Sequence, residues 1–140
     1  MIIRTFLFLS LSIFLVSCTS TADLGAGKTG KSIMVKGNKY DDIWNASIKS
    51  LQSEKGDQSL EIKKNIGITE QDKSRGYIKA ESGLSLFSYG EVIGVFIEPA
   101  NDAPSHIIEV ESRSRLKTNV TANNWEDEIL KSIKSQLHNK

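Results

Sequence analysis

The apolar side chains of residues 40–53 recur at the spacing of a helix that buries one face. They fall at i, i+3, i+4, i+8 and i+11, and they are Tyr40, Ile43, Trp44, Ile48 and Leu51. Asp41 and Asp42 lie in the first turn, where carboxylates are favoured by the positive end of the helix dipole. The pattern therefore predicts a helix over residues 40–53.

A second stripe of this kind lies near the end of the sequence. Its apolar positions recur every four residues, with Leu130 beside them, and they are Trp125, Ile129, Ile133 and Leu137. Three consecutive carboxylates at residues 126–128 fill the first turn, and Asn123 or Asn124 can cap it. The sequence therefore predicts a C-terminal helix that begins near Trp125.

Between these helices the pattern changes to the two-residue alternation of strands. It predicts strands over residues 59–69, 76–81, 91–98 and 106–116, with a polar turn at residues 72–75, and a short strand over residues 32–36 before the first helix. The run 91–98 is apolar almost throughout. In the last strand four charged residues occupy alternate positions, which predicts a face in water. They are Glu109, Glu111, Arg113 and Arg115.

This order of elements predicts an α+β fold. Helices on one face of an antiparallel sheet are the natural way to bury both apolar stripes. We expect a curved antiparallel sheet with two helices packed on one face, in a single domain over residues 33–140. Trp44 and Trp125 are expected to be core residues, because a tryptophan on an apolar helix stripe is more often core than a ligand anchor.

The first residues have the pattern of a secretory signal. Arg4 supplies a positive charge, and residues 6–16 form an apolar run that is well short of the ~20 residues a transmembrane helix needs. The run ends at Leu15-Val16-Ser17-Cys18. We therefore expect residues 1–17 to be removed as a signal peptide.

The residues Leu15, Val16, Ser17 and Cys18 resemble a bacterial lipobox. The resemblance implies cleavage before Cys18, transfer of diacylglycerol to its thiol, and acylation of the new amino terminus, typically with palmitate. Cys18 is the only cysteine, so no internal disulfide can form. Two or more acyl chains would anchor the protein stably. We expect it in the bacterial cell envelope, facing the periplasm, and Thr19 favours the outer membrane over the inner one.

The segment 18–32 contains few large apolar residues and many small ones, which is typical of a flexible tether. Within it, Gly25–Ser32 matches the phosphate-binding pattern G-x-x-x-x-G-K-S. Such a loop follows a buried strand and opens a helix, whereas here Cys18 lies upstream and the strand-like residues 32–36 lie downstream. We expect no nucleotide site.

Charge and composition narrow the function further. Removal of residues 1–17 takes away one of 18 basic side chains and none of 17 acidic ones, so the basic excess of nucleic-acid binding is missing. His106 and His138 are the only histidines, and they have no partner at zinc-motif spacing. No serine lies in G-x-S-x-G. We expect no catalytic residue, no metal and no cofactor.

Three stretches, residues 40–51, 60–62 (LEI) and 76–80 (GYIKA), resemble the helix–strand–strand module of small bacterial envelope lipoproteins with a helix-grip domain. The C-subunit lipoprotein of the outer-membrane barrel-assembly machinery is the best-known example. The resemblance covers roughly residues 33–137 and implies a curved antiparallel sheet that grips a C-terminal helix. That lipoprotein has two such domains and this sequence has room for one, so fold carries over better than function.

We therefore expect a non-catalytic, lipid-anchored envelope lipoprotein that acts through contacts with an envelope protein, in outer-membrane assembly or maintenance. The alternative is a module that binds a small apolar or lipid ligand between the sheet and the C-terminal helix, with room made by the glycines at 83, 90 and 94. An enzyme acting on envelope polymers ranks last. An apolar cavity would favour the alternative, and a filled interior with an exposed apolar patch would favour protein contacts.

Overall fold

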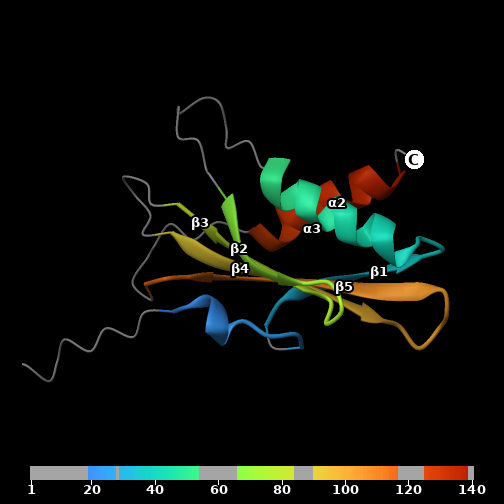
Figure 1. The fold of residues 1–140 in the computed structure, drawn as a ribbon, viewed down its shortest axis with the longest axis horizontal. Helices are drawn as coiled ribbons and strands as arrows, with labels where there is room; N and C mark the ends of the chain where they lie inside the picture. The colour runs from blue at the N-terminus through green and yellow to red at the C-terminus, as the bar shows by residue number, and fades with distance from the viewer. Residues whose placement is uncertain (1–18, 28, 54–65, 84–89, 117–124, 139–140) are drawn as a thin grey trace, which may run out of the picture.

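Five antiparallel strands form one open sheet, and two helices cover one of its faces (Figure 1). The computed structural model describes residues 19–27, 29–53, 66–83, 90–116 and 125–138. The elements follow in the order η2 (Thr21–Asp23), β1 (Lys31–Lys36), α2 (Tyr40–Ser53), β2 (Ile66–Asp72), β3 (Tyr77–Ser82), β4 (Glu91–Pro99), β5 (Ser105–Ser114) and α3 (Trp125–His138). The predicted α+β class, with two helices on one face of an antiparallel sheet, is confirmed.

The strands are arranged in the order β1-β5-β4-β3-β2. Strands β2 to β5 form a meander in which each strand pairs with the next one along the sequence. β1 joins the other side of β5, with Lys31 opposite Val110 and Lys36 opposite Ser105. The last strand along the chain therefore lies inside the sheet, and β1 and β2 form its two edges.

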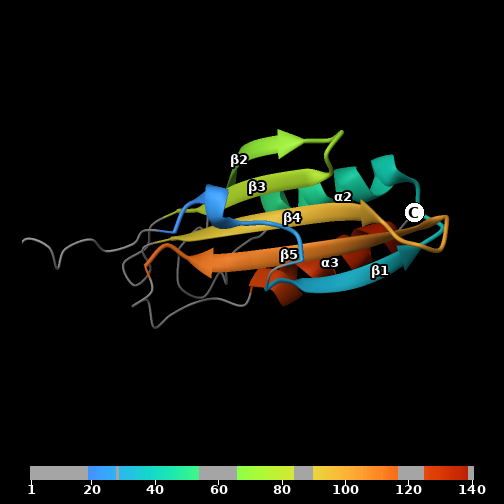
Figure 2. The same cartoon turned by 90° about the horizontal axis from the view of Figure 1, so that it is seen from below.

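The two ends of the sheet are distinguished by what they carry (Figure 2). At one end, which we call the hairpin end, residues 100–104 join β4 to β5 and residues 73–76 join β2 to β3. At the other end, which we call the proximal end, β3 stops at Ser82, β4 starts at Glu91 and β5 stops at Ser114. Helix α2 runs from the hairpin end toward the proximal end, and α3 runs back.

The main core lies between the sheet and the helices. Ile43 and Leu51 of α2 and Ile129 and Ile133 of α3 are buried against side chains from β3, β4 and β5. Trp44 and Trp125 belong to the same buried cluster, with 8% and 2% of their surface exposed. The apolar stripes of both predicted helices thus form the core, as expected.

The helix bounds agree with the sequence pattern more closely than the strand bounds do. The predicted helix 40–53 is α2 itself, and α3 begins at Trp125. Strand β2 extends to Asp72, three residues beyond the predicted end, because it continues to pair with β3 past a register shift between Ile68 and Glu70. The remainder of the predicted strand, residues 59–65, lies outside the described residues. Neither described helix is long and apolar enough to cross a membrane.

Candidate functional site

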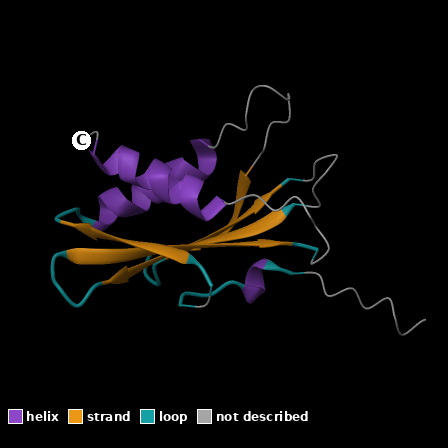
Figure 3. Cartoon of the chain, turned by 180° about the vertical axis from the view of Figure 1, so that it is seen from behind, coloured by secondary structure: helices purple, strands orange, loops and turns teal. Residues whose placement is uncertain are grey.

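The face of the sheet opposite the helices is covered by the N-terminal part of the structure (Figures 1 and 3). We call residues 19–27, 29 and 30 the N-terminal strap. Leu24 of the strap is 4% exposed and packs in a second cluster with Val92 and Phe96 of β4. Because helices cover one face of β4 and the strap covers the other, residues 92–97 are buried on both sides of the sheet, which explains why they are all apolar.

Two carboxylates of β5 fasten the strap to the sheet. Glu111 accepts a hydrogen bond from the backbone N–H of Gly25 at 3.0 Å and another from the Thr29 hydroxyl at 2.7 Å. Glu109 accepts the backbone N–H of Gly27 at 2.6 Å. Further along, Gly30 lies so close to β5 that an added Cβ would stand 2.6 Å from the Val110 carbonyl oxygen. The strap therefore combines an apolar contact with polar bonds to one strand.

Glu111 is fully buried. Burial and these hydrogen bonds together determine its pKa. Burial works to raise its pKa, but the hydrogen bonds from Thr29, Gly25 and Arg113 outweigh that effect and leave the pKa below its usual value. Arg113 also forms an ion pair with Glu111 at 2.5 Å. The side chain is thus held as a carboxylate beneath the strap.

These contacts correct two predictions. The segment 18–32 was expected to be a flexible tether, but Lys31 and Ser32 belong to β1 and the strap is packed on the sheet. The alternating charges of β5 were expected to face water, but Glu111 lies beneath the strap. The physical reason is shared: β4 presents apolar side chains on both faces, so the second face also needs a cover.

One sequence signal could have revealed the strap. Two helices cover only one face of a sheet, yet residues 92–97 contain no polar side chain. Such a continuous apolar strand is typical of burial on both faces. The strap itself contains a single large apolar residue, Leu24, and its carboxylate partners lie far along the sequence, so its own pattern gives no warning.

The strap starts at the proximal end of the sheet. The backbone N–H of Thr19 donates to the Arg115 carbonyl at 3.1 Å, and the Arg115 N–H donates to the Gly90 carbonyl at 3.2 Å. Asp23 accepts the N–H of Ser20 at 2.7 Å, and this hydrogen bond caps the short 3-10 helix η2. Thr19, the first described residue, is therefore hydrogen-bonded to the residue that follows β5.

The match to the phosphate-binding pattern, Gly25–Ser32, spans the end of the strap and the start of β1, and its described residues are not arranged as in a phosphate-binding loop. A phosphate site needs free backbone N–H groups at the start of a helix. Here the N–H groups of Gly25 and Gly27 donate to Glu111 and Glu109, and the chain continues into strand β1. Lys31, the lysine of the motif, pairs with Asp127 of α3 at 2.6 Å. The sheet's own carboxylates occupy the donors that a phosphate would use.

The lipobox residues Leu15, Val16, Ser17 and Cys18 lie outside the described residues, so their lipidation stays a prediction. The carboxylates in the first turn of α3, by contrast, lie within the described residues. Glu126, the first of the three carboxylates of α3, accepts the backbone N–H of Ser112 at 3.0 Å. That N–H lies on β5 beyond the reach of β1, so the carboxylate replaces a missing strand partner.

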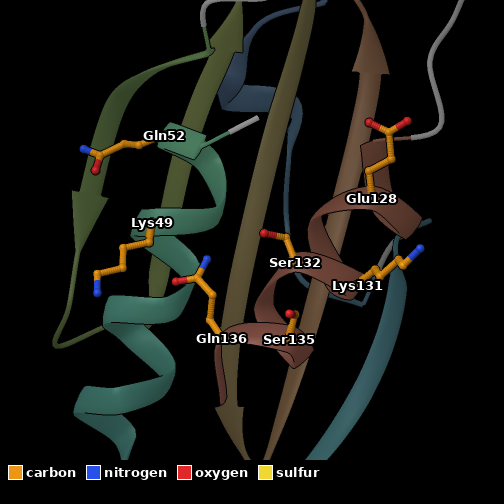
Figure 4. A pocket seen from close by; sticks show the side chains of 7 residues that line it. All are labelled: Lys49, Gln52, Glu128, Lys131, Ser132, Ser135 and Gln136. Carbon is orange, nitrogen blue, oxygen red and sulfur yellow. The ribbon is translucent and has the colours of Figure 1, made fainter. Parts of the chain in front are cut away.

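The outer surface of the helix pair carries an open hollow between α2 and α3 (Figure 4). The residues that line it have polar side chains or side chains of either charge, and they are Lys49, Gln52, Glu128, Lys131, Ser132, Ser135 and Gln136. The Gln136 amide donates to the Ser50 hydroxyl at 2.9 Å and ties the two helices together. We call this surface the helix groove. It offers hydrogen-bonding groups and no histidine or cysteine.

The two histidines lie on different elements. The His106 ring of β5 is 5.8 Å from the Tyr40 ring, and His138 ends α3, where its Nδ1 lies 2.8 Å from the Lys134 carbonyl oxygen. Among the residues that the structure describes, no group of three histidine, cysteine, aspartate or glutamate side chains is placed to hold a metal ion.

Comparison with known proteins shows resemblance in fold alone. No protein-family model matches the sequence. No curated protein matches it either. The fold is similar to that of the protein XoxI from Bacillus cereus, with a TM-score of 0.53 at 10% identity, over 79% of this chain and 93% of that one. An uncharacterised protein from Bacillus thuringiensis has a TM-score of 0.47 at 10% identity over the same shares.

Proposed function

We propose that this protein is a lipid-anchored lipoprotein of the bacterial cell envelope that acts through contacts with another envelope protein, as a non-catalytic accessory to outer-membrane assembly or maintenance. The observation that carries the proposal is the sequence Leu15-Val16-Ser17-Cys18 directly after an apolar signal segment. In a lipoprotein the cysteine becomes the first residue of the mature protein, and its lipid chains hold the protein at the membrane.

The interior supports protein contacts over ligand binding. Between sheet and helices the buried side chains form one contiguous cluster to which β3, β4, β5, α2 and α3 all contribute. Gly94, one of the glycines expected to make room for a ligand, lies on the strap side, where the Phe96 ring and Leu24 occupy the space next to it. The hollow between the helices lies open on the outer surface and is lined by residues with polar or charged side chains.

The surface indicates the character of the contact. Met34 is the one large apolar side chain that is strongly exposed in the described parts of the chain. These parts therefore lack the exposed apolar patch that was expected to favour protein contacts. The helix groove presents lysine, glutamate, glutamine and serine side chains instead. Hydrogen bonds and paired charges would therefore hold the partner, as they do at the rim of transient interfaces.

Lipidation is tested with the full-length chain expressed in a bacterium that processes lipoproteins. We expect labelled palmitate to be incorporated by the unaltered protein and not by Cys18→Ala, which should also leave the membrane fraction. Ser17→Ala, which keeps a small residue before the cysteine, is the matched control and should be labelled normally. Label in Cys18→Ala at the level of the unaltered protein would contradict the proposal.

The contact is tested by a photoreactive amino acid placed at Ser132 in the helix groove, with position Gln71 on edge strand β2 as the control. In intact cells we expect a crosslinked product from Ser132 that is lost when Lys131→Glu reverses a charge beside it. Equal crosslinking from both positions, unaffected by Lys131→Glu, would contradict a specific contact at the groove.

A further inference from the structure

The strap leaves no spacer between the proposed lipid anchor and the folded domain. Thr19 is hydrogen-bonded to Arg115 at the proximal end of the sheet, and Cys18 is its neighbour in the sequence. Neighbouring Cα atoms stand about 3.8 Å apart. A lipid on Cys18 is therefore attached one residue before Thr19, which is hydrogen-bonded to the residue that follows β5.

We propose that, with Cys18 lipidated as in the proposed function, the proximal end of the sheet is the end nearer the lipid headgroups and the hairpin end points away from the membrane. The partner of this surface is the bilayer that holds the acyl chains. The strap determines the orientation, because it fixes the attachment point at one end of the sheet.

The described surface carries no large apolar patch on which the domain could lie flat. Strongly exposed large apolar side chains are limited, in the described residues, to Met34 on β1. The two arginines of β5 are paired within the protein, Arg113 with Glu111 and Arg115 with Glu81, which leaves little positive charge there to attract anionic lipids. The orientation is therefore argued from the attachment point, which the hydrogen bond between Thr19 and Arg115 fixes at one end of the sheet.

The orientation carries the hairpin end well away from the bilayer. β4 contains nine residues, and at about 3.3 Å per residue it is about 30 Å long. The hairpin at residues 100–104 therefore stands about 30 Å beyond the proximal end. The start of α2 and the end of α3 lie at this same end, away from the bilayer.

The test uses the full-length lipoprotein, purified from membranes and reconstituted in phosphatidylcholine vesicles with nitroxide on the lipid headgroups. Lipidation blocks the thiol of Cys18, so an introduced cysteine is the only free one. A fluorophore is attached through Leu116→Cys at the proximal end or, as the matched control, through Asp102→Cys in the exposed β4–β5 hairpin. We expect the headgroup nitroxides to quench the label at 116 and to leave the label at 102 unquenched.

A second variant tests whether the strap sets the distance. A flexible glycine–serine insert of about twelve residues between Cys18 and Thr19 leaves every contact of the strap in place but adds up to about 40 Å of reach. We expect the insert to abolish quenching at 116. The control is the chain without the insert, carrying the same label at position 116.

The outcomes separate this inference from the proposed function. Absence of lipid mass on the N-terminal peptide would overturn the proposed function and the orientation with it. A lipidated protein whose two labels are quenched equally, or whose label at 116 is quenched to the same extent with the insert, would overturn the orientation alone. Selective quenching at 116 that the insert removes would establish it.

Discussion

Two tryptophans mark the ends of the core. Trp125 is 2% exposed and Trp44 8% exposed, and both lie in the cluster between sheet and helices. We expect Trp44→Ala and Trp125→Ala each to lower the free energy of unfolding by about 3–5 kcal/mol, a large part of the roughly 5–15 kcal/mol available to a domain. The more complete burial of Trp125 predicts the larger loss.

Urea denaturation of residues 19–140 measures this loss, with Lys49→Ala on the exposed helix groove as the control. The control should stay within about 0.5 kcal/mol of the unaltered protein. A loss of that small size in either tryptophan variant, together with a red-shifted, quencher-accessible emission, would instead assign the ring to a binding surface.

Glu111 makes the strap sensitive to acid. Its folded-state pKa lies below the usual 4.5, so its contribution to stability is complete above the unfolded pKa and is lost as the pH falls through the folded pKa. We expect Glu111→Gln to be less stable than the unaltered protein at neutral pH and to lack this part of the loss on acidification.

The measurement is the free energy of unfolding at a series of pH values from neutral to below 4.5. Glu128→Gln, which changes an exposed carboxylate of the helix groove, is the matched control and should give a curve parallel to that of the unaltered protein. Parallel curves for Glu111→Gln as well would show that its carboxylate does not fasten the strap.

Among the elements, the turn between β2 and β3 depends on one glycine. Gly76 has a φ of +70°, and a Cβ there would meet the carbonyl oxygen of Ile97. The Gly76 carbonyl also accepts the Ile97 N–H at 2.7 Å. We expect Gly76→Ala to cost more than about 1 kcal/mol, because strain and a backbone clash act together.

Gly67 on the neighbouring strand supplies the comparison. A Cβ at Gly67 meets nothing within 4 Å, and its φ is not positive. Gly67→Ala should therefore be neutral or stabilising by up to about 1 kcal/mol. Thermal unfolding of both variants decides the matter, and equal destabilisation would show that the turn does not require its glycine.

An element can be predicted from the sequence when the pattern that stabilises it lies within its own residues. The helices were found because their stripes are local, from Tyr40 to Leu51 and from Trp125 to Leu137. The strap was missed because its fixing groups are distributed: Leu24 meets β4, and Gly25 meets a carboxylate of β5. Long-range hydrogen bonds leave no periodicity in the sequence. The apolar run 92–97 indicates that the second face of the sheet is covered, but nothing in the sequence identifies the strap as the cover.

For the whole molecule, the strap acts as a third layer. Without it, Val92, which is fully buried, and Phe96 would be exposed to water. We expect a protein that starts at residue 31 to be less stable than one that starts at residue 19, by about 1.5–3 kcal/mol for the loss of the Leu24 contact. Denaturation of the two soluble forms measures it, with Leu24→Ala in the longer form as a check that should reproduce most of the loss. Equal stability would contradict a structural role for the strap.

The pairing of β1 with β5 also has a consequence for the order of folding. The meander β2 to β5 needs only neighbours in the sequence, whereas Lys31 must find Val110 and Lys36 must find Ser105, which closes a long loop and slows the step. For a protein exported as proposed, the amino-terminal strand β1 would cross the membrane well before its partner β5. The five-stranded sheet would then be completed only after β5 has also been translocated.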